Sequence, residues 1–310
     1  MIKTISALAV AAGLLLTMPV FAQDLPVDSV RITVPGGAGG GTDTVTRLFA
    51  DFLSDKTGAT TAVTNQAAGG GVIATTTLAG ERSDGSRLMV GHAKMHTQTL
   101  GGNTDLSFRD LTPLGTISSI NTVYVARSDT PYGTLPELIE YAKANPGEVV
   151  VATEASGTSQ VMGEALNEAA GGNLQLVDFG STSNRVPALI GNNAQVSLLP
   201  IDTTQEYVKS GDLKALAIIN RDGDVNAPEI PTATSLGVDI HFPLTVTLYG
   251  PPNMEPELVD AFAAAIKSVT DDPEFQQRVA AIGQSPTAMS PQETTAFLEE
   301  EFEFVSRMMQ

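Results

Sequence analysis

A short β-branched segment, a glycine-rich loop and an amphipathic segment follow one another near the start of the chain. Residues 30–34 have the composition of a strand, and Pro35 and the glycines up to Gly41 then interrupt regular structure. Apolar residues recur at helical spacing over residues 42–56, and Gly58 ends that pattern. A strand that leads through a tight loop into a helix is typical of an α/β fold.

Strand and helix patterns alternate through most of the chain. Further strands are predicted at residues 61–64, 88–91, 122–126, 149–152, 174–179, 195–199, 213–219 and 245–249. Helices are predicted between several of them and, in the C-terminal third, at residues 256–269, 273–282 and from Ser290 onward. Alternation of this kind favours largely parallel pairing. We expect two α/β lobes, one formed by residues 23–122 and 246–310 and the other by residues 123–245, because this length exceeds one usual core.

The first 22 residues have the pattern of an export signal. Lys3 supplies a positive start, residues 7–20 are apolar, and Val20 and Ala22 occupy the −3 and −1 positions of a cleavage site. The apolar run is short for a membrane span, although a retained N-terminal anchor is the alternative. The chain has no cysteine, which excludes disulfides and a lipid-modified cysteine. We therefore expect cleavage after Ala22 and a protein of the Gram-negative periplasm without a lipid anchor.

The formal net charge of −18 makes nucleic acid an improbable partner, because phosphate contacts need clustered Lys and Arg. The acidic residues are scattered along predicted helices, which is typical of a solvated surface. A chain this acidic repels anions as a whole. Any site for an anion must therefore be positive locally.

The first candidate site is the segment at residues 35–43, named the first loop, which includes Gly36, Gly37, Ala38, Gly39, Thr42 and Asp43. Glycines let the backbone approach a ligand closely, and the N–H groups and dipole of the following helix favour a carboxylate or phosphate. The alternative is a flexible turn in which Asp43 serves only as a helix cap. The loop lacks the Gly-Lys-Ser/Thr end of a phosphate loop, and the acid of a dinucleotide fingerprint falls inside a helix, so we expect no nucleotide cofactor.

The second candidate site, named the second loop, also lies between a strand and a helix and consists of Ser156, Gly157, Thr158 and Ser159. Alone it is explained equally well as a helix cap. Two helix N-termini, one from each lobe, can instead face each other and bind one anion between them.

Catalytic and metal-binding patterns are weak. His92 and His96 have helical metal-ligand spacing, but the Glu of the metalloprotease motif is missing and the segment directly follows a strand, so we expect no metal site. No serine lies in a Gly-x-Ser-x-Gly motif.

The order of the motifs resembles the Bug-type solute-binding receptors of tripartite tricarboxylate transporters. Residues 34–43 and 155–160 are similar to the two ligand loops of that family, further similarities occur at residues 83–88, 134–147 and 211–217, and residues 229–237 match loosely. The resemblance implies a bilobal type II periplasmic-binding-protein fold with a hinge and a carboxylate held mainly by backbone amides. It also implies ligand contacts at Gly36, Gly37, Ala38, Gly39, Gly157, Thr158 and Ser159, an aromatic position at Phe179 and a cleft loop that contains Asp202.

This chain departs from the family pattern at two positions. Gly36 replaces an aromatic residue, and Lys94, next to Ala93 after the third strand, replaces a small hydroxyl residue. We expect Lys94 either to pair with a second or third ligand carboxylate or to point to solvent, and we consider Arg185 a weaker helper because it falls inside a helix.

These features predict a non-enzymatic, monomeric receptor that captures a small organic carboxylate, with a di- or tricarboxylate favoured, for integral-membrane transporter subunits. One alternative is an exported enzyme that uses Asp202 or Asp43 as a base. The other is a sensor subunit for a signalling kinase.

Overall fold

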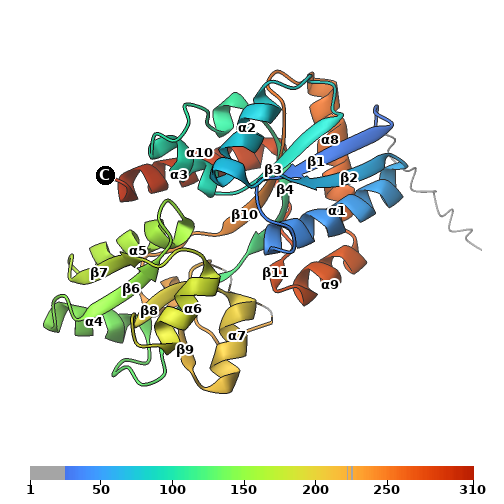
Figure 1. Cartoon of the computed structure of the whole chain (residues 1–310). Coiled ribbons are helices and arrows are strands. Elements are labelled where there is room, and N and C mark those ends of the chain that lie inside the picture. The colour runs from blue at the N-terminus through green and yellow to red at the C-terminus, as the bar shows by residue number, and fades with distance from the viewer. Residues whose placement is uncertain (1–24, 222, 225) are drawn as a thin grey trace, which may run out of the picture.

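The computed structural model describes residues 25–221, 223–224 and 226–310, and the predicted export signal lies outside them. Two β-sheets, each with helices on both faces, form two lobes (Figure 1). The six-stranded sheet of the first lobe has the order β11 (Gln284–Ser285), β4 (Thr112–Ile120), β10 (Leu244–Gly250), β3 (Arg87–Gly91), β1 (Ser29–Val34), β2 (Thr60–Asn65). The five-stranded sheet of the second lobe has the order β7 (Leu174–Asp178), β6 (Val149–Thr153), β8 (Val196–Pro200), β5 (Thr122–Arg127), β9 (Leu213–Ile218).

Aromatic side chains bury one face of the first sheet under helices. This face is covered by α1 (Gly41–Thr57), α8 (Pro256–Thr270) and α9 (Pro273–Ala281). Phe49, Phe262 and Phe275 are fully buried there, and each such side chain contributes on the order of 2 kcal/mol of hydrophobic stabilisation. The opposite face is covered by α2 (Val72–Ala79), α3 (Lys94–Leu100) and α10 (Pro291–Met308).

The second sheet is buried on both faces, and side chains of its interior strand β5 alternate between the two cores. In β5, Tyr124 packs with α4 (Leu135–Ala144) and α5 (Thr158–Ala169). Its neighbours Val123 and Val125 point to the other face, with α6 (Thr182–Ile190) and α7 (Ile201–Ser210). Because successive side chains of a strand alternate, a run of apolar residues serves both cores.

The predicted parallel pairing is only partly correct. The parallel pairs are β1 with β2 and β3, and β6 with β7 and β8. β10 is antiparallel to β3 and β4, β11 is antiparallel to β4, and β5 is antiparallel to β8 and β9. The chain reaches β5 and β10 by crossing from one lobe to the other, without an intervening helix of the same lobe. The alternation of strands and helices therefore does not indicate the direction of these two strands.

Two crossovers join the lobes and form the hinge. Only Asn121 separates β4 of the first lobe from β5 of the second, and the chain returns to the first lobe at Leu244. The buried Asn121 amide donates hydrogen bonds to Asp224 (2.6 Å) and to Ser285 of β11 (2.8 Å). The predicted division of the chain between residues 122 and 123 and between 245 and 246 stays a prediction.

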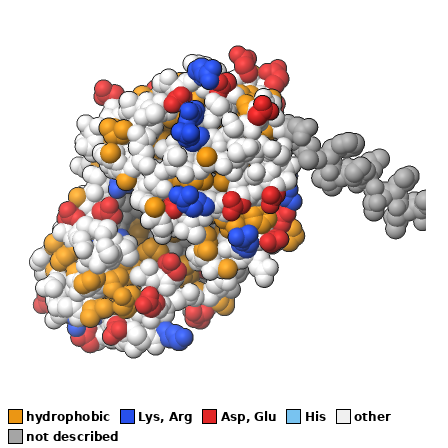
Figure 2. All heavy atoms as spheres, turned by 45° about the vertical axis from the view of Figure 1, so that its right-hand side comes forward, with side chains coloured by type: hydrophobic (Ala, Val, Ile, Leu, Met, Phe, Trp, Pro, Cys, Tyr) orange, Lys and Arg blue, Asp and Glu red, His pale blue; other side chains and the backbone are white. Residues whose placement is uncertain are grey.

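The last helix contacts both lobes. Leu298 of α10 lies in the apolar cluster of the first lobe, whereas Val305 lies in the main core of the second. Within the described part of the chain, no helix has an apolar stretch long enough to cross a bilayer. Acidic side chains lie scattered over both lobes, and a hollow separates the lobes (Figure 2).

Candidate functional site

A cleft of about 530 Å³ lies between the two lobes. This volume falls in the usual range for small-molecule sites. The first lobe lines it with Pro35, Gly36, Gly40, Gly41, Thr42, His92, Lys94, Ile282, Gly283 and Gln284. The second lobe lines it with Glu154, Gly157, Thr158, Ser159, Thr182, Arg185, Leu198, Pro200, Asp202 and Thr203, and residues of the crossovers complete it.

The seven-residue helix α3 begins at this cleft with Lys94, whose N–H donates to Nδ1 of His92 (3.3 Å). Four longer helices, α1, α5, α6 and α7, also begin there. Their N-cap residues are Gly40, Gly157, Ser181 and Pro200, and none of the four provides a side-chain hydrogen bond to the first turn. The side-chain-capped helices α4, α9 and α10 do not begin at the cleft. The first N–H groups of a helix have no partner within the helix, and its N-terminus carries about half a positive charge. The cleft thus collects donors and positive potential suited to an anion.

Asp43 holds the first loop in place. Its carboxylate accepts hydrogen bonds from the Gly39 N–H (2.8 Å), from Arg47 (2.9 and 3.0 Å) and from Asn65 (2.9 Å). Burial alone would raise the pKa of Asp43, but these hydrogen bonds and the charge of Arg47 lower the pKa below its ordinary value. The acceptor capacity of Asp43 is therefore used by the first loop, α1 and β2 of the same lobe.

Hydrogen bonds to α5, to α3 and to the residue after β6 hold the second loop in place. Ser156 has a left-handed backbone with a φ of 55°, which is uncommon for a residue with a side chain. Its N–H donates to Gln160 (2.8 Å), and its carbonyl accepts from the hydroxyl of Thr97 in the first lobe (2.6 Å). The Ser159 hydroxyl accepts from the Glu154 N–H (2.9 Å). The loop is thus oriented before a ligand arrives.

The charged side chains of the cleft come from both lobes. The Lys94 ammonium, for which either a ligand carboxylate or solvent is expected as the partner, lies 3.4 Å from the Glu154 carboxylate. Burial, together with the charge of Lys94, lowers the pKa of His92 to about 4, and this imidazole is neutral near pH 7.

His96 has different surroundings from His92. It is buried, hydrogen-bonded to Glu301 (2.8 Å) and packed edge-on against the rings of Phe108 and Phe302. Among the described residues, no group of three potential ligands is placed to hold a metal ion.

The structure brings together only some of the predicted site residues. The cleft is lined by Gly36, Thr42, Lys94, Gly157, Thr158, Ser159 and Asp202. Gly39 lines an adjoining cavity together with Asp202. The cleft lining does not include Gly37, Ala38, Asp43, Ala93 or Phe179. Ala93 is buried in the main core of the second lobe, and Phe179 packs against the second core of that lobe.

Several lining residues carried little or no sequence signal. Residues 282–284 reach the cleft from far along the chain through β11, which pairs with β4. Arg185, considered a weak helper, lines the cleft because the first turn of α6 begins there. The strand–loop–helix pattern at residues 174–190 is a local signal that could have indicated this position.

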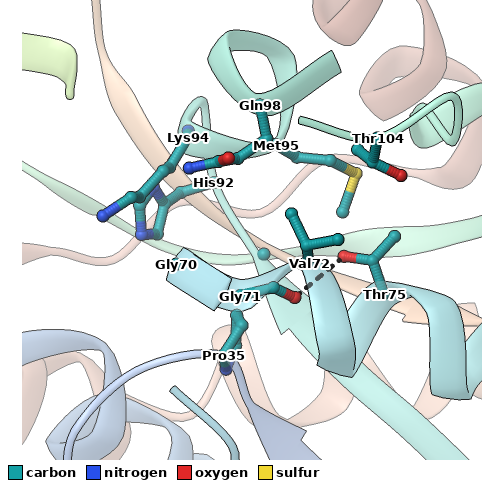
Figure 3. A pocket seen from close by; sticks show the side chains of 11 residues that line it. Pro35, Gly70, Gly71, Val72, Thr75, His92, Lys94, Met95, Gln98 and Thr104 are labelled. Atoms are coloured by element: carbon teal, nitrogen blue, oxygen red, sulfur yellow. Dashed lines mark hydrogen bonds between the residues drawn. The ribbon is translucent and has the colours of Figure 1, made fainter. Parts of the chain in front are cut away.

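A second, much smaller cavity of about 30 Å³ lies behind the first loop (Figure 3). Figure 3 shows His92, Lys94 and Gln98 on one side of it and Pro35 on the other, with Gly70 and Gly71 between. Such a volume holds one or two water molecules and no organic acid. The interlobe cleft is therefore the candidate ligand site.

Two α/β lobes joined by a hinge, with a ligand-sized cleft between them, define a periplasmic-binding-protein fold. The model of the TctC family, the "Tripartite tricarboxylate transporter family receptor", matches residues 45–310, and the chain belongs to this family. Receptors of this family are periplasmic solute-binding proteins, which are not a class of enzyme.

Individual relatives match over nearly the whole chain. Protein BugT of Bordetella pertussis is 26% identical over 295 residues, which cover 92% of this chain and 89% of BugT. The structure of the periplasmic binding protein BugD is 25% identical with a TM-score of 0.72, covering 90% of this chain and 96% of BugD. MatC from Rhodopseudomonas palustris, solved with bound malate, is 24% identical with a TM-score of 0.74 and covers 92% of this chain and 100% of MatC.

Proposed function

We propose that the protein binds a small organic carboxylate in the interlobe cleft, with a di- or tricarboxylate favoured, and delivers it to the membrane subunits of a tripartite tricarboxylate-type transporter. One observation carries this proposal: four helix N-termini without side-chain caps converge on one cleft. They supply N–H donors and local positive potential in a chain whose net charge is −18.

The two loops provide a reason for closure on binding. The first loop belongs to one lobe and the second loop to the other, so a ligand that contacts both stabilises the closed arrangement over the open one. We propose ligand contacts at Gly36, Thr42, Gly157, Thr158 and Ser159, largely through backbone N–H groups. The predicted Asp202 contributes an acceptor to the cleft lining, and it also accepts a hydrogen bond from the Thr203 N–H.

The relatives supply the setting for this proposal. MatC, whose likeness at 24% identity supports the fold, holds malate, a dicarboxylate. Membership of the TctC family supports a transporter as the partner and the periplasm as the location, and it agrees with the export signal predicted at residues 1–22. We propose that the receptor acts as a monomer.

Binding is tested with the purified protein lacking residues 1–22. A thermal-shift screen followed by calorimetry would use butyrate, succinate, malate, citrate and benzoate, with sodium chloride at matched ionic strength as the control. A carboxylate ligand raises the melting temperature because it binds the folded protein alone. If no acid in the panel raises the melting temperature, the proposal is overturned.

The role of backbone donors is tested at Thr158, the first residue of α5. Proline is tolerated at this helix position and removes the N–H, and Gly157 has the extended backbone (φ −102°, ψ 165°) that proline requires before it. We expect Thr158→Pro to weaken carboxylate binding about tenfold. Thr158→Val keeps the N–H and loses the hydroxyl, so it serves as the matched control.

A further inference from the structure

Arg185 is a buried cation at the cleft. It lies in the first turn of α6, is only 5% exposed and lines the cavity between the lobes. One terminal nitrogen donates to the Leu198 carbonyl (2.5 Å) and to the Ser197 hydroxyl (3.2 Å), and the other donates to the Thr182 hydroxyl (2.9 Å). These neutral partners hold the guanidinium in one position.

The hydrogen bonds of Arg185 leave its charge without a direct counterion. Its buried Nε has no hydrogen-bond partner among the described residues. Arg47 and Arg127, which do not line the cleft, each pair with a carboxylate at short range. Glu154 is the acidic residue that favours the charged form of Arg185, and its carboxylate is already shared with Lys94. A buried charge in this position is unfavourable until an anion compensates it.

The charges around the cleft set the expected charge of the ligand. Lys94 and Arg185 carry two positive charges, and Glu154 and Asp202 carry two negative charges. The side chains therefore cancel, and the four helix N-termini add about two positive charges in total, since each contributes about one half. A dianion balances this sum, whereas a monoanion leaves about one positive charge uncompensated.

We propose that Arg185 determines specificity by binding a second carboxylate of the ligand, while the N–H groups of the two loops bind the first. The inference rests on the proposed function and narrows it to acids with at least two carboxylates. A guanidinium suits this role because its fixed fork of donors matches the geometry of a carboxylate.

Matched pairs of acids that differ by one carboxylate test this assignment. Succinate against butyrate and glutarate against valerate would be titrated by calorimetry into the wild type, Arg185→Met and Arg185→Lys. We expect the wild type to prefer each diacid and Arg185→Met to lose about 10- to 100-fold of diacid affinity, with monoacid affinity changed less than about threefold. Arg185→Lys keeps the charge and should retain part of the preference.

Arg127→Met is the matched control. Arg127 also donates to a carbonyl of α6, that of Leu189 (3.0 Å), but it does not line the cleft. Its removal should leave the ratio of diacid to monoacid affinity unchanged, and circular dichroism verifies the fold of each variant.

Three outcomes overturn the assignment of Arg185 and leave the proposed function intact. The wild type shows no preference for diacids, or Arg185→Met loses diacid and monoacid affinity equally. In the third outcome, Lys94→Met abolishes the preference for diacids and Arg185→Met keeps it. A wild type that binds no carboxylate overturns the proposed function itself.

Discussion

The ammonium of Lys94 and the carboxylate of Glu154 lie 3.4 Å apart and join the first lobe to the second across the ligand cleft. Lys94 opens α3, and Glu154 follows β6 directly. One turn further along α3, the hydroxyl of Thr97 donates to the Ser156 carbonyl. One edge of the cleft is thus held by contacts between the lobes, and on the other side the Asn226 amide of the second lobe donates to the Ala280 carbonyl of α9 (3.2 Å).

We expect the Lys94–Glu154 pair to influence lobe opening more than stability. Both side chains are about one-third exposed (32% and 34%), and ion pairs with this exposure contribute roughly 0–1 kcal/mol because water and salt screen them. A double-mutant cycle with Lys94→Met and Glu154→Gln should give a coupling energy below about 1 kcal/mol in urea unfolding. Small-angle X-ray scattering should show a larger radius of gyration for each single variant. An unchanged radius in both variants would contradict this expectation.

Gly71 should not tolerate a side chain. Its φ is 102°, and an added Cβ would lie 3.0 Å from the Cβ of Pro35 and 3.3 Å from the Pro35 carbonyl oxygen. Gly71→Ala therefore combines backbone strain with displacement of the first loop, and we expect a loss of about 2–4 kcal/mol in unfolding free energy and weaker ligand binding. Gly102→Ala is the control, because Gly102 has a φ of 70° and no atom within 4 Å of the added Cβ. It should cost about 1 kcal/mol and leave binding unchanged.

His92 should make stability depend on pH below neutrality. Its folded pKa of about 4 lies below the ordinary value of 6.5, so the unfolded chain takes up a proton first as the pH falls. The unfolding free energy of the wild type should therefore fall between pH 6.5 and 4, by up to about 3 kcal/mol from this residue. His92→Asn should show a flatter profile in the same range when chemical denaturation is repeated at each pH. Parallel profiles for the two proteins would exclude His92 as the cause.

Glu301 should be important for stability although it lies outside the cleft. Glu301 and His96 are both buried and 2.8 Å apart, and burial raises the pKa of Glu301 while His96 partly offsets the shift. Glu301→Ala leaves a buried imidazole nitrogen without its partner and should cost about 3–5 kcal/mol. Glu299→Ala, on the same helix, removes an exposed pair with Arg109 and should cost less than about 1 kcal/mol. Similar losses in both variants, measured by thermal and urea unfolding, would argue against this distinction.

Local signals predicted most of the secondary structure. Thr134 and Ser290 each open a capping box, Ser/Thr-x-x-Glu, which marks the start of a helix in the sequence, and each accepts a hydrogen bond from the N–H of the glutamate three residues later in α4 and α10. β4 was missed because Pro113 and Gly115 interrupt its apolar pattern. α7 is not among the predicted helices, because the resemblance implies only a loop that contains Asp202; Ile201, Thr204 and Tyr207 nevertheless recur at helical spacing on its buried face.

The candidate site could be predicted only where it is local in sequence. Both ligand loops follow a strand and open a helix, and this context sufficed to find them. The partner of Lys94 could not be predicted, because Glu154 lies 60 residues away and meets it only through the arrangement of the lobes. Arg185 shows the same limit, since its burial and its neutral partners on β8 depend on tertiary packing.

The C-terminal helix links the two lobes a third time. Its first half packs on β4, and near its end Phe304 contacts Phe242 of the second lobe at a ring distance of 5.4 Å. Rotation about the crossovers must therefore slide one end of this helix over an apolar surface. The contact between Phe304 and Phe242 therefore resists opening of the lobes, although neither residue lines the ligand cleft. The angle between the lobes thus depends in part on residues outside the binding site.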